Sequence, residues 1–187
     1  MLEIVPYKED WPEEFQALAR VLRGGLGELA KRIDHIGSTS VPGLPAKDII
    51  DIQITVNILD DGVVAAMAAR GYAQRAGMYD HRPAHASGPE ADWQKFYFDA
   101  PSGQRPTHTH MRVQGRANQR YPLLFRDYLR AHPATAAAYA ELKRQLAAHL
   151  ADPGTYPDVK DPAVDLIYFA AEEWAAATAW KPGPADA

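Results

Sequence analysis

Asp51 is the residue of this chain best placed for chemistry, because it stands near the start of its most strand-like segment, Ile49 to Val56. A Gly37-Ser38 pair precedes it, and a loop rich in proline and glycine between them carries Lys47. Glycine lets the backbone approach a phosphate, whose oxygens are bound by backbone amides, a hydroxyl and a lysine. A carboxylate on the following strand could hold a divalent metal ion, the usual partner of transferred phosphates. The stretch therefore predicts a site for nucleotide phosphates.

Two histidines two residues apart form a second candidate group. His108 and His110 lie in the strand-like segment Thr107 to Val113, and alternate residues of a strand share one face. Beside Asp51 on a neighbouring strand, they would form a ligand set that suits zinc, manganese or iron better than magnesium. Alternatively, one of them, for which we take His110, acts as general base for an attacking hydroxyl. The third alternative is two polar residues on the wet face of a sheet.

The position two residues after Asp51 limits the chemistry. Two acids at i and i+2 of a strand point the same way and can share the two metal ions of nucleotidyl transfer. Here the second residue is Gln53, which is neutral and a weak ligand for magnesium. The sequence leaves open whether Asp51 serves metal-assisted transfer or is a buried acid hydrogen-bonded to the Gly37-Ser38 turn.

Further cations are candidates for holding phosphate. Lys160 stands just before the expected last helix, with Tyr156 nearby, and either could close a pocket from the helical side. Arg105 and Arg112 are candidate clamps, because guanidinium forks match phosphate and carboxylate oxygens. For Arg126, which Asp127 follows, we favour a structural ion pair at a helix junction.

Length and composition exclude several classes of protein. The chain has 187 residues, 47% of them hydrophobic, which is about one domain with a sizeable core. It has no cysteine, which excludes disulfides and thiolate metal sites and fits the cytoplasm. No apolar run approaches the roughly 18 residues of a membrane span, and the N-terminus does not read as a secretory signal. A net charge of −4 argues against a general nucleic-acid binder.

Hydrophobic patterning predicts strands in the first two thirds and helices after them, which is typical of an α+β fold. Expected strands cover 2–5, 33–36, 49–56, 72–79, 95–99 and 107–113. Expected helices begin at Asp10-Trp11, with a bend or break at Gly24-Gly25, cover 60–70 and 123–130, and begin again at Pro133 and at Asp161-Pro162, the last ending near Trp180. Residues 1–180 are expected to form one domain and 181–187 a flexible tail.

The order of these motifs resembles a known family. The Gly37-Ser38 turn followed by Asp51 resembles the Gly-Ser…Asp-x-Asp signature of the nucleotidyltransferase fold, and most of all the GrpB family. Residues 107–113 resemble the His-x-His strand of that family, and residues 124–133 resemble its helix junction. Two later blocks, 139–143 and 156–160, also match, so the resemblance covers nearly the whole chain.

The resemblance implies a nucleotidyltransferase-like fold: a mixed, mostly antiparallel sheet with flanking helices and a C-terminal helical lobe. The site would lie in the groove between sheet and lobe. Three functions stay open: a metal-assisted transferase that moves a nucleotidyl group from a nucleoside triphosphate to a small or protein acceptor, a non-catalytic nucleotide- or phosphate-binding module, and a metal-dependent hydrolase. The expected partners are a small nucleotide or phosphate ligand and a magnesium, manganese or zinc ion, with no membrane.

Overall fold

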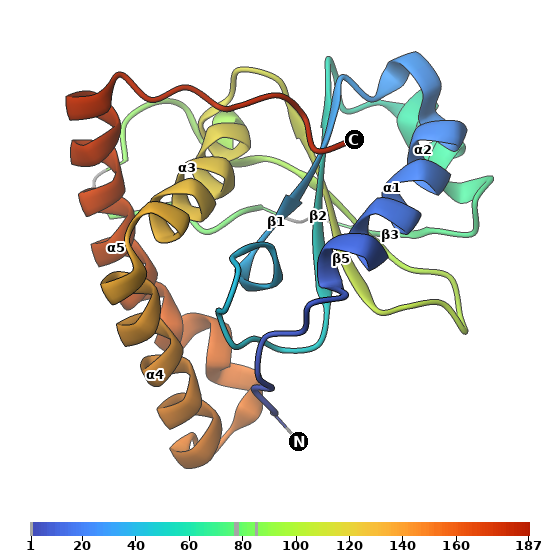
Figure 1. The fold of residues 1–187 in the computed structure, drawn as a ribbon. Coiled ribbons are helices and arrows are strands. Elements are labelled where there is room, and N and C mark those ends of the chain that lie inside the picture. The colour runs from blue at the N-terminus through green and yellow to red at the C-terminus, as the bar shows by residue number, and fades with distance from the viewer. Residues whose placement is uncertain (1, 77–78, 85) are drawn as a thin grey trace.

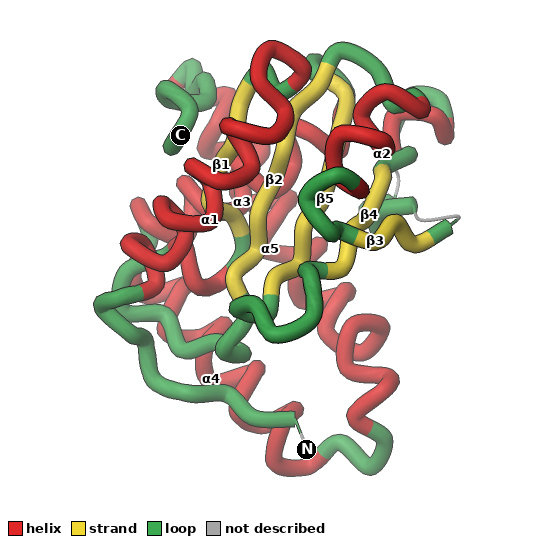
Figure 2. The backbone as a smooth tube through the Cα atoms, turned by 90° about the vertical axis from the view of Figure 1, so that its right-hand side faces the viewer, coloured by secondary structure: helices red, strands yellow, loops and turns green. Residues whose placement is uncertain are grey.

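Five strands form one sheet in the order β1-β2-β5-β4-β3 (Figure 2). The structure is a computed structural model, and it describes residues 2–76, 79–84 and 86–187. The strands are β1 (Arg32–Ile36), β2 (Ile50–Val56), β3 (Ala73–Arg75), β4 (Phe96–Asp99) and β5 (Thr107–Val113). The helices are α1 (Trp11–Leu26), α2 (Asp61–Ala68), α3 (Ala117–Ala131), α4 (Pro133–His149) and α5 (Tyr156–Thr178).

The pairing of the strands confirms the mixed, mostly antiparallel sheet. β2 and β5 run parallel, whereas β1 with β2, β5 with β4 and β4 with β3 are antiparallel. The register sets Asp51 beside His108 and Gln53 beside His110. The residues that the sequence singled out on two separate segments therefore stand on adjacent strands and on one face of the sheet.

The opposite face of the sheet carries the main hydrophobic core. Ile50, Ile52 and Ile54 alternate along β2 with polar residues, and each is fully buried. They pack in one cluster with Trp11 and Phe15 of α1. A β-branched strand with one apolar face and an amphipathic helix over it is the expected arrangement for these patterns. Burying this face leaves the Asp51 face free for α3, α4 and α5.

Helices α3, α4 and α5 form the helical lobe, which lies on the Asp51 side of the sheet (Figure 1). A smaller apolar cluster joins the lobe to the loop after β1 and contains Val41, Leu44, Leu129, Tyr139 and Val164. Pro133 opens α4, as the sequence predicted. No helix in the described part of the chain is both long and apolar enough to cross a membrane.

The starts of two helices differ from the sequence-based expectation. α3 begins at Ala117 and not at Leu123, so Pro122 lies inside the helix. α5 begins at Tyr156 and not at Pro162, which lies inside the helix. The dipeptide Tyr156-Pro157 carries the same start signal, since a proline without an N–H fits any first helical turn. Gly24-Gly25 does not break α1. A Cβ on Gly25 would lie 2.8 Å from Nε of Arg70, so this glycine permits a close approach between α1 and the end of α2.

Both ends of the chain and the strand expected over 72–79 also differ from the sequence-based expectation. The N-terminal strand over 2–5 is reduced to one bridge between Val5 and Ala46. The strand expected over 72–79 is the short β3, and positions 77 and 78 lie outside the described residues. Instead of a free tail, residues 181–187 run along β1 (Figure 1), where Ala187 and Ile33 exchange two backbone hydrogen bonds. The carboxylate of Asp186 accepts from the backbone N–H of His35 and from Arg126.

Candidate functional site

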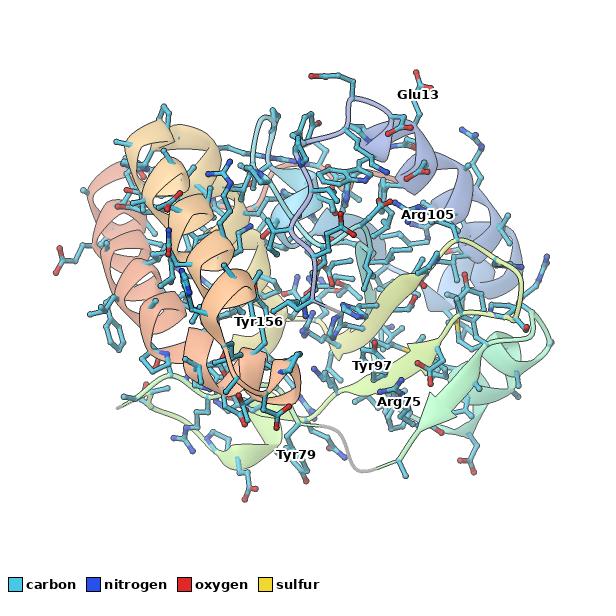
Figure 3. The ribbon with its side chains drawn as sticks, turned by 90° about the horizontal axis from the view of Figure 1, so that it is seen from below. Glu13, Arg75, Tyr79, Tyr97, Arg105 and Tyr156 are labelled. Carbon is cyan, nitrogen blue, oxygen red and sulfur yellow. The ribbon has the colours of Figure 1, made fainter. Side chains whose placement is uncertain are left out.

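A pocket of about 490 Å³ lies between the sheet and the helical lobe. In Figure 3 it lies between Tyr156 of the lobe and Tyr97 and Arg75 of the sheet. All seven residues to which the sequence assigned a site role line this pocket: Gly37, Ser38, Lys47, Asp51, His108, His110 and Lys160. The pocket is also lined by Arg75, Lys95, Tyr97, Tyr121, Phe125, Tyr139, Lys143 and Tyr156, none of which the sequence marked as a primary candidate.

The Gly37-Ser38 turn is shaped by Asp51. Gly37 has φ +69° and ψ −172°, a region that is essentially restricted to glycine. A Cβ at this position would lie 2.2 Å from Oδ2 of Asp51 and 2.8 Å from its Cβ. Glycine is therefore required at this position for two reasons: the backbone angles, and the lack of space beside the carboxyl group of Asp51. The turn continues into a short 3-10 helix, Ser38–Ser40, in which the Ser40 hydroxyl donates to the carbonyl of Gly37 at 2.6 Å.

Asp51 and His108 are in direct contact across β2 and β5. Oδ1 of Asp51 lies 2.9 Å from Nδ1 of His108. Both side chains reach solvent, with exposed fractions of 25% for Asp51 and 39% for His108. When Nδ1 donates to the carboxylate, Nε2 of the ring is left to accept a proton. The pair has the geometry of a base held by an orienting carboxylate.

His110 lies in a different environment, although it stands on the same strand face. Burial lowers the pKa of His110 well below its ordinary value, and the charges of Arg112 and Lys95 lower it further. Its ring is therefore neutral at pH 7. Nδ1 of His110 is buried and has no hydrogen-bond partner among the described residues. Of the two histidines, His108 is thus the better placed to exchange protons with a ligand.

Three lysines from three different segments line the pocket in addition to Lys95, which is paired with Asp80. Lys143 of α4, which the sequence analysis did not single out, is 2% exposed. Its Nζ donates to Oγ of Ser38 at 2.8 Å and to the carbonyl of Pro45 at 2.5 Å. Burial, aided by the charge of Lys160, lowers the pKa of Lys143 to about 7. The sequence held one indication of this role. Tyr139 and Lys143 are spaced i, i+4, so they lie on one face of α4 and can line the same pocket.

The other two lysines are also short of negative partners. Nζ of Lys47 lies 4.2 Å from the ring centre of Tyr156, a cation–π contact. The pKa of Lys47 is lowered by burial and then by Lys160. Burial also lowers the pKa of Lys160, whose nearest acid is Asp161 at 3.9 Å. Among the described residues that line the pocket, Asp51 is the only one with a carboxylate.

Gln53 is sealed away from the pocket. It is 0% exposed and is absent from the pocket lining. Nη1 of Arg112 donates to Oε1 of Gln53 at 2.7 Å, and Nε2 of Gln53 donates to the carbonyl of Gln119 in α3 at 2.9 Å. The side-chain amide thus joins the sheet to the helical lobe, with its oxygen and its nitrogen both engaged.

Arg112 is in turn held by a buried acid that the sequence did not reveal. Asp80 accepts from Nε and Nη2 of Arg112, each at 2.7 Å, and from Lys95 at 2.7 Å. Asn118 of α3 donates to the same carboxylate at 3.0 Å. Burial alone would raise the pKa of Asp80, but Arg112 and Lys95 hold it well below its ordinary value. The network is charge-paired and structural.

The geometry limits what metal the site could hold. The fold resemblance implies two ions shared by two carboxylates, but the second position carries Gln53, whose oxygen faces a guanidinium. Asp51 and His108 approach each other, yet the described residues contain no group of three or more His, Asp or Glu side chains placed around one ion. The donor set therefore does not fit a two-metal centre.

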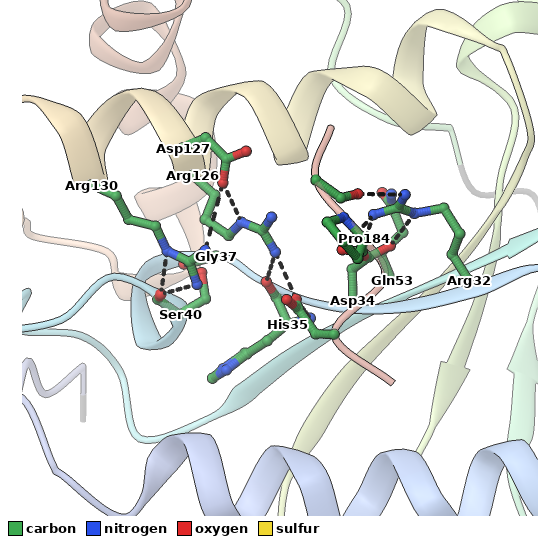
Figure 4. Close-up of polar contacts among 12 residues, drawn as sticks. Arg32, Asp34, His35, Gly37, Ser40, Gln53, Arg126, Asp127, Arg130 and Pro184 are labelled. Carbon is green, nitrogen blue, oxygen red and sulfur yellow. Dashed lines mark hydrogen bonds and ion pairs between the residues drawn. The ribbon is translucent and has the colours of Figure 1, made fainter. Parts of the chain in front are cut away.

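The arginines have structural partners. Arg105 pairs with Glu14 and Asp48 outside the pocket. Arg126 donates to the carbonyl of His35 at 2.9 Å and pairs with Asp127 at 2.8 Å (Figure 4). The latter pair is the helix-junction role favoured from the sequence. None of Arg105, Arg112 and Arg126 lines the pocket, so none of them is placed to clamp a ligand there.

Comparison with known proteins places the chain among bacterial relatives. The family profile described as "GrpB protein" matches residues 1–169. The chain is 36% identical to "Dephospho-CoA kinase" of Mycolicibacterium paratuberculosis, over 97% of this chain and 48% of that protein. It is also 36% identical to "UPF0157 protein YqkA" of Bacillus subtilis, over 92% of this chain and 48% of that protein. The chain thus spans about half the length of these relatives.

Comparison of folds also finds a GrpB protein. The crystal structure of conserved protein GrpB from Enterococcus faecalis matches with a TM-score of 0.72 and 30% identity, over 92% of this chain and 99% of that one. The Cid1 poly(U) polymerase with MgGTP bound matches with a TM-score of 0.51 and 14% identity, over 76% of this chain and 44% of that one. The second likeness is one of fold alone.

Proposed function

Because the chain belongs to the GrpB family and has a nucleotidyltransferase-like fold, we propose that its pocket binds a nucleoside polyphosphate by the phosphate groups. The phosphates lie against the Gly37-Ser38 turn, between Lys47, Lys143 and Lys160. The name kinase among the relatives is in keeping with a nucleotide ligand. The observation that carries the proposal is the gathering of these three lysines, besides the Asp80-paired Lys95, in a pocket lined by one carboxylate.

The electrostatics of the pocket favour an anion. In the described part of the chain, neither Lys47 nor Lys143 forms an ion pair, and burial disfavours the charged form of each. Such groups are costly to bury unless a charge of opposite sign is added. Phosphate oxygens would accept from several ammonium groups at once, and charge-assisted hydrogen bonds are stronger than neutral ones. Binding of the phosphates would thus offset the cost of burying the ammonium groups of Lys47 and Lys143 without a negative partner.

The rest of the pocket suits the nucleoside. Aromatic side chains line it on the side of the lobe, among them Tyr121, Phe125, Tyr139 and Tyr156. Flat aromatic surfaces offer stacking to a base of any kind, which leaves the identity of the base open. The volume of about 490 Å³ falls within the usual range of small-molecule sites, roughly 300–1,000 Å³.

Nucleotidyl transfer is the second candidate function, and the contact between Asp51 and His108 favours it. Nε2 of His108 would take the proton from an acceptor hydroxyl while Asp51 orients the ring. The acceptor oxygen would form a bond to the α-phosphorus, and the bond from that phosphorus to the leaving pyrophosphate would break. The acceptor would be a small molecule or a protein. Pyrophosphate release that stops in His108→Gln would support this step.

Titration calorimetry tests the binding proposal. ATP, GTP, CTP and UTP are titrated into the wild type, and the matching nucleosides serve as ligands without phosphate. Replacing Lys143 by Met should weaken the triphosphate by about 10–100-fold, since a hydrogen bond to a charged group contributes roughly 1.5–3 kcal/mol. Lys31→Met, at an exposed lysine before β1, is the matched control and should leave affinity unchanged. Equal affinity for nucleosides and triphosphates, or unchanged binding by Lys143→Met, would overturn the proposal.

A further inference from the structure

We infer that this pocket binds its polyphosphate ligand without a divalent cation, with the three lysines in place of the metal charge. The inference rests on the proposed function and adds the way in which the ligand is held. It runs against what the nucleotidyltransferase-like fold implies, and the reason lies in the partners of Gln53 and Asp51.

The first step concerns the position of the second acid. A metal ion at Gln53 would need a free oxygen there, but that oxygen accepts from Arg112 at 2.7 Å. The guanidinium would also lie close to the ion and repel it. Asp80 fixes Arg112 with two hydrogen bonds of 2.7 Å, so the arginine cannot turn away without losing a buried ion pair. The second metal position is thus closed by a network and not merely by one neutral side chain.

The second step concerns Asp51. One of its oxygens accepts from His108 at 2.9 Å, and the other is packed against the backbone of Gly37. Magnesium requires near-octahedral oxygen ligands and is held in phosphate sites through one or two carboxylates. Here a single carboxylate has one oxygen bonded to His108 and the other crowded by Gly37, so it is a poor anchor for the ion.

The third step concerns charge. Nζ of Lys143 is fixed on Ser38 by a hydrogen bond of 2.8 Å, and Lys47 and Lys160 line the same pocket. Three ammonium groups would offset most of the charge of a polyphosphate and would repel a dication that arrived with it. Lysine binds phosphate as a point charge without needing a metal bridge. The lysines of the pocket therefore supply the positive charge that a divalent ion would otherwise supply to the phosphates.

The test is calorimetric titration of ATP, GTP, CTP and UTP, each into the wild type, in buffer with magnesium and in buffer with EDTA at the same ionic strength. We expect dissociation constants that agree within about threefold. Binding that weakens tenfold or more in EDTA would overturn the inference and leave nucleotide binding intact. No binding of any of the four triphosphates in either buffer would overturn the inference and the proposed function together.

A second measurement uses manganese alone, detected by electron paramagnetic resonance. We expect the wild type without nucleotide to show no stoichiometric manganese site. A stoichiometric site that is lost in Asp51→Asn would show that the carboxylate anchors an ion, which contradicts the inference. The control variant Asp61→Asn, at an exposed acid of α2 that does not line the pocket, should change nothing in either experiment.

Discussion

At the scale of single residues, Gly37 and Asp51 determine each other. The glycine adopts an angle that other residues avoid, and the carboxyl group occupies the space where a side chain would stand. The sequence marked both residues for phosphate and metal chemistry, with a hydrogen bond from the turn to a buried Asp51 as the alternative. In the structure Asp51 packs against Gly37, but it is partly exposed and its hydrogen bond is with His108. The contact of Asp51 with Gly37 means that no side chain fits at position 37 while Asp51 keeps its place.

Gly37→Ala should be strongly destabilising. The added Cβ must overlap with Asp51, and overpacking costs roughly 1–3 kcal/mol on top of the cost of the positive φ. Gly43→Ala is the matched control, since Gly43 has φ +75° but nothing within 4 Å of a Cβ. Urea unfolding should give a loss of about 2–4 kcal/mol for Gly37→Ala and about 1 kcal/mol for Gly43→Ala. Equal losses would show that Asp51 does not crowd the turn.

Lys143 should make ligand binding depend on pH. Its pKa in the free pocket is about 7, and an anion would raise that pKa by favouring the ammonium form. Above pH 7 the ligand must bind together with a proton, so affinity should fall by up to about tenfold per pH unit. Calorimetry in buffers of different ionisation enthalpy should detect the proton uptake. Affinity for ATP that stays constant from pH 7 to 9 would contradict this.

Lys143 should also make the stability of the ligand-free protein depend on pH, in the direction opposite to ligand affinity. Because the folded pKa lies below the unfolded value of 10.5, the unfolded chain binds more protons between pH 7 and pH 10.5. The free energy of unfolding should therefore rise with pH in that window, and Lys143→Met should remove this contribution. Urea unfolding of both proteins at pH 7, 8 and 9 checks the sign. A wild type that follows the variant at every pH would show that the amine is not perturbed.

At the scale of elements, the network around Asp80 ties β2, β5 and α3 together. Asp80→Asn would leave Arg112 and Lys95 buried without a negative partner, a change that costs roughly 3–5 kcal/mol. The matched control is Asp99→Asn, whose partner Arg75 is 58% exposed and whose loss should cost at most about 1 kcal/mol. Denaturant unfolding measures both. A loss for Asp80→Asn as small as the control would mean that water reaches the network.

The elements also show what sequence could and could not predict. β2 and β5 were predicted because β-branched residues alternate with polar ones, and their pairing brings Asp51 and His108 together as expected. The start of α5 was wrong because two proline signals compete, at Pro157 and Pro162, and only packing selects the earlier one. Asp80 was hidden in a segment that reads as a loop. Its role depends on a partner 32 residues away, which no local pattern encodes.

At the scale of the whole molecule, the pocket is a product of assembly. Lys47 comes from the loop before β2, Lys143 from α4 and Lys160 from α5, and they meet only when the lobe packs on the sheet. The sequence named two of these lysines from motifs, but the third required the fold. Family membership and the nucleotidyltransferase-like fold are established by the comparisons, whereas the ligand is our proposal.

The most direct test of nucleotide binding is a crystal structure of the protein with a non-hydrolysable nucleoside triphosphate. We expect density for the phosphates against Ser38 and Lys143, between Lys47 and Lys160, with the base among the aromatic residues of the lobe. A triphosphate bound elsewhere on the molecule, or with its base and not its phosphates beside Lys143, would contradict the account.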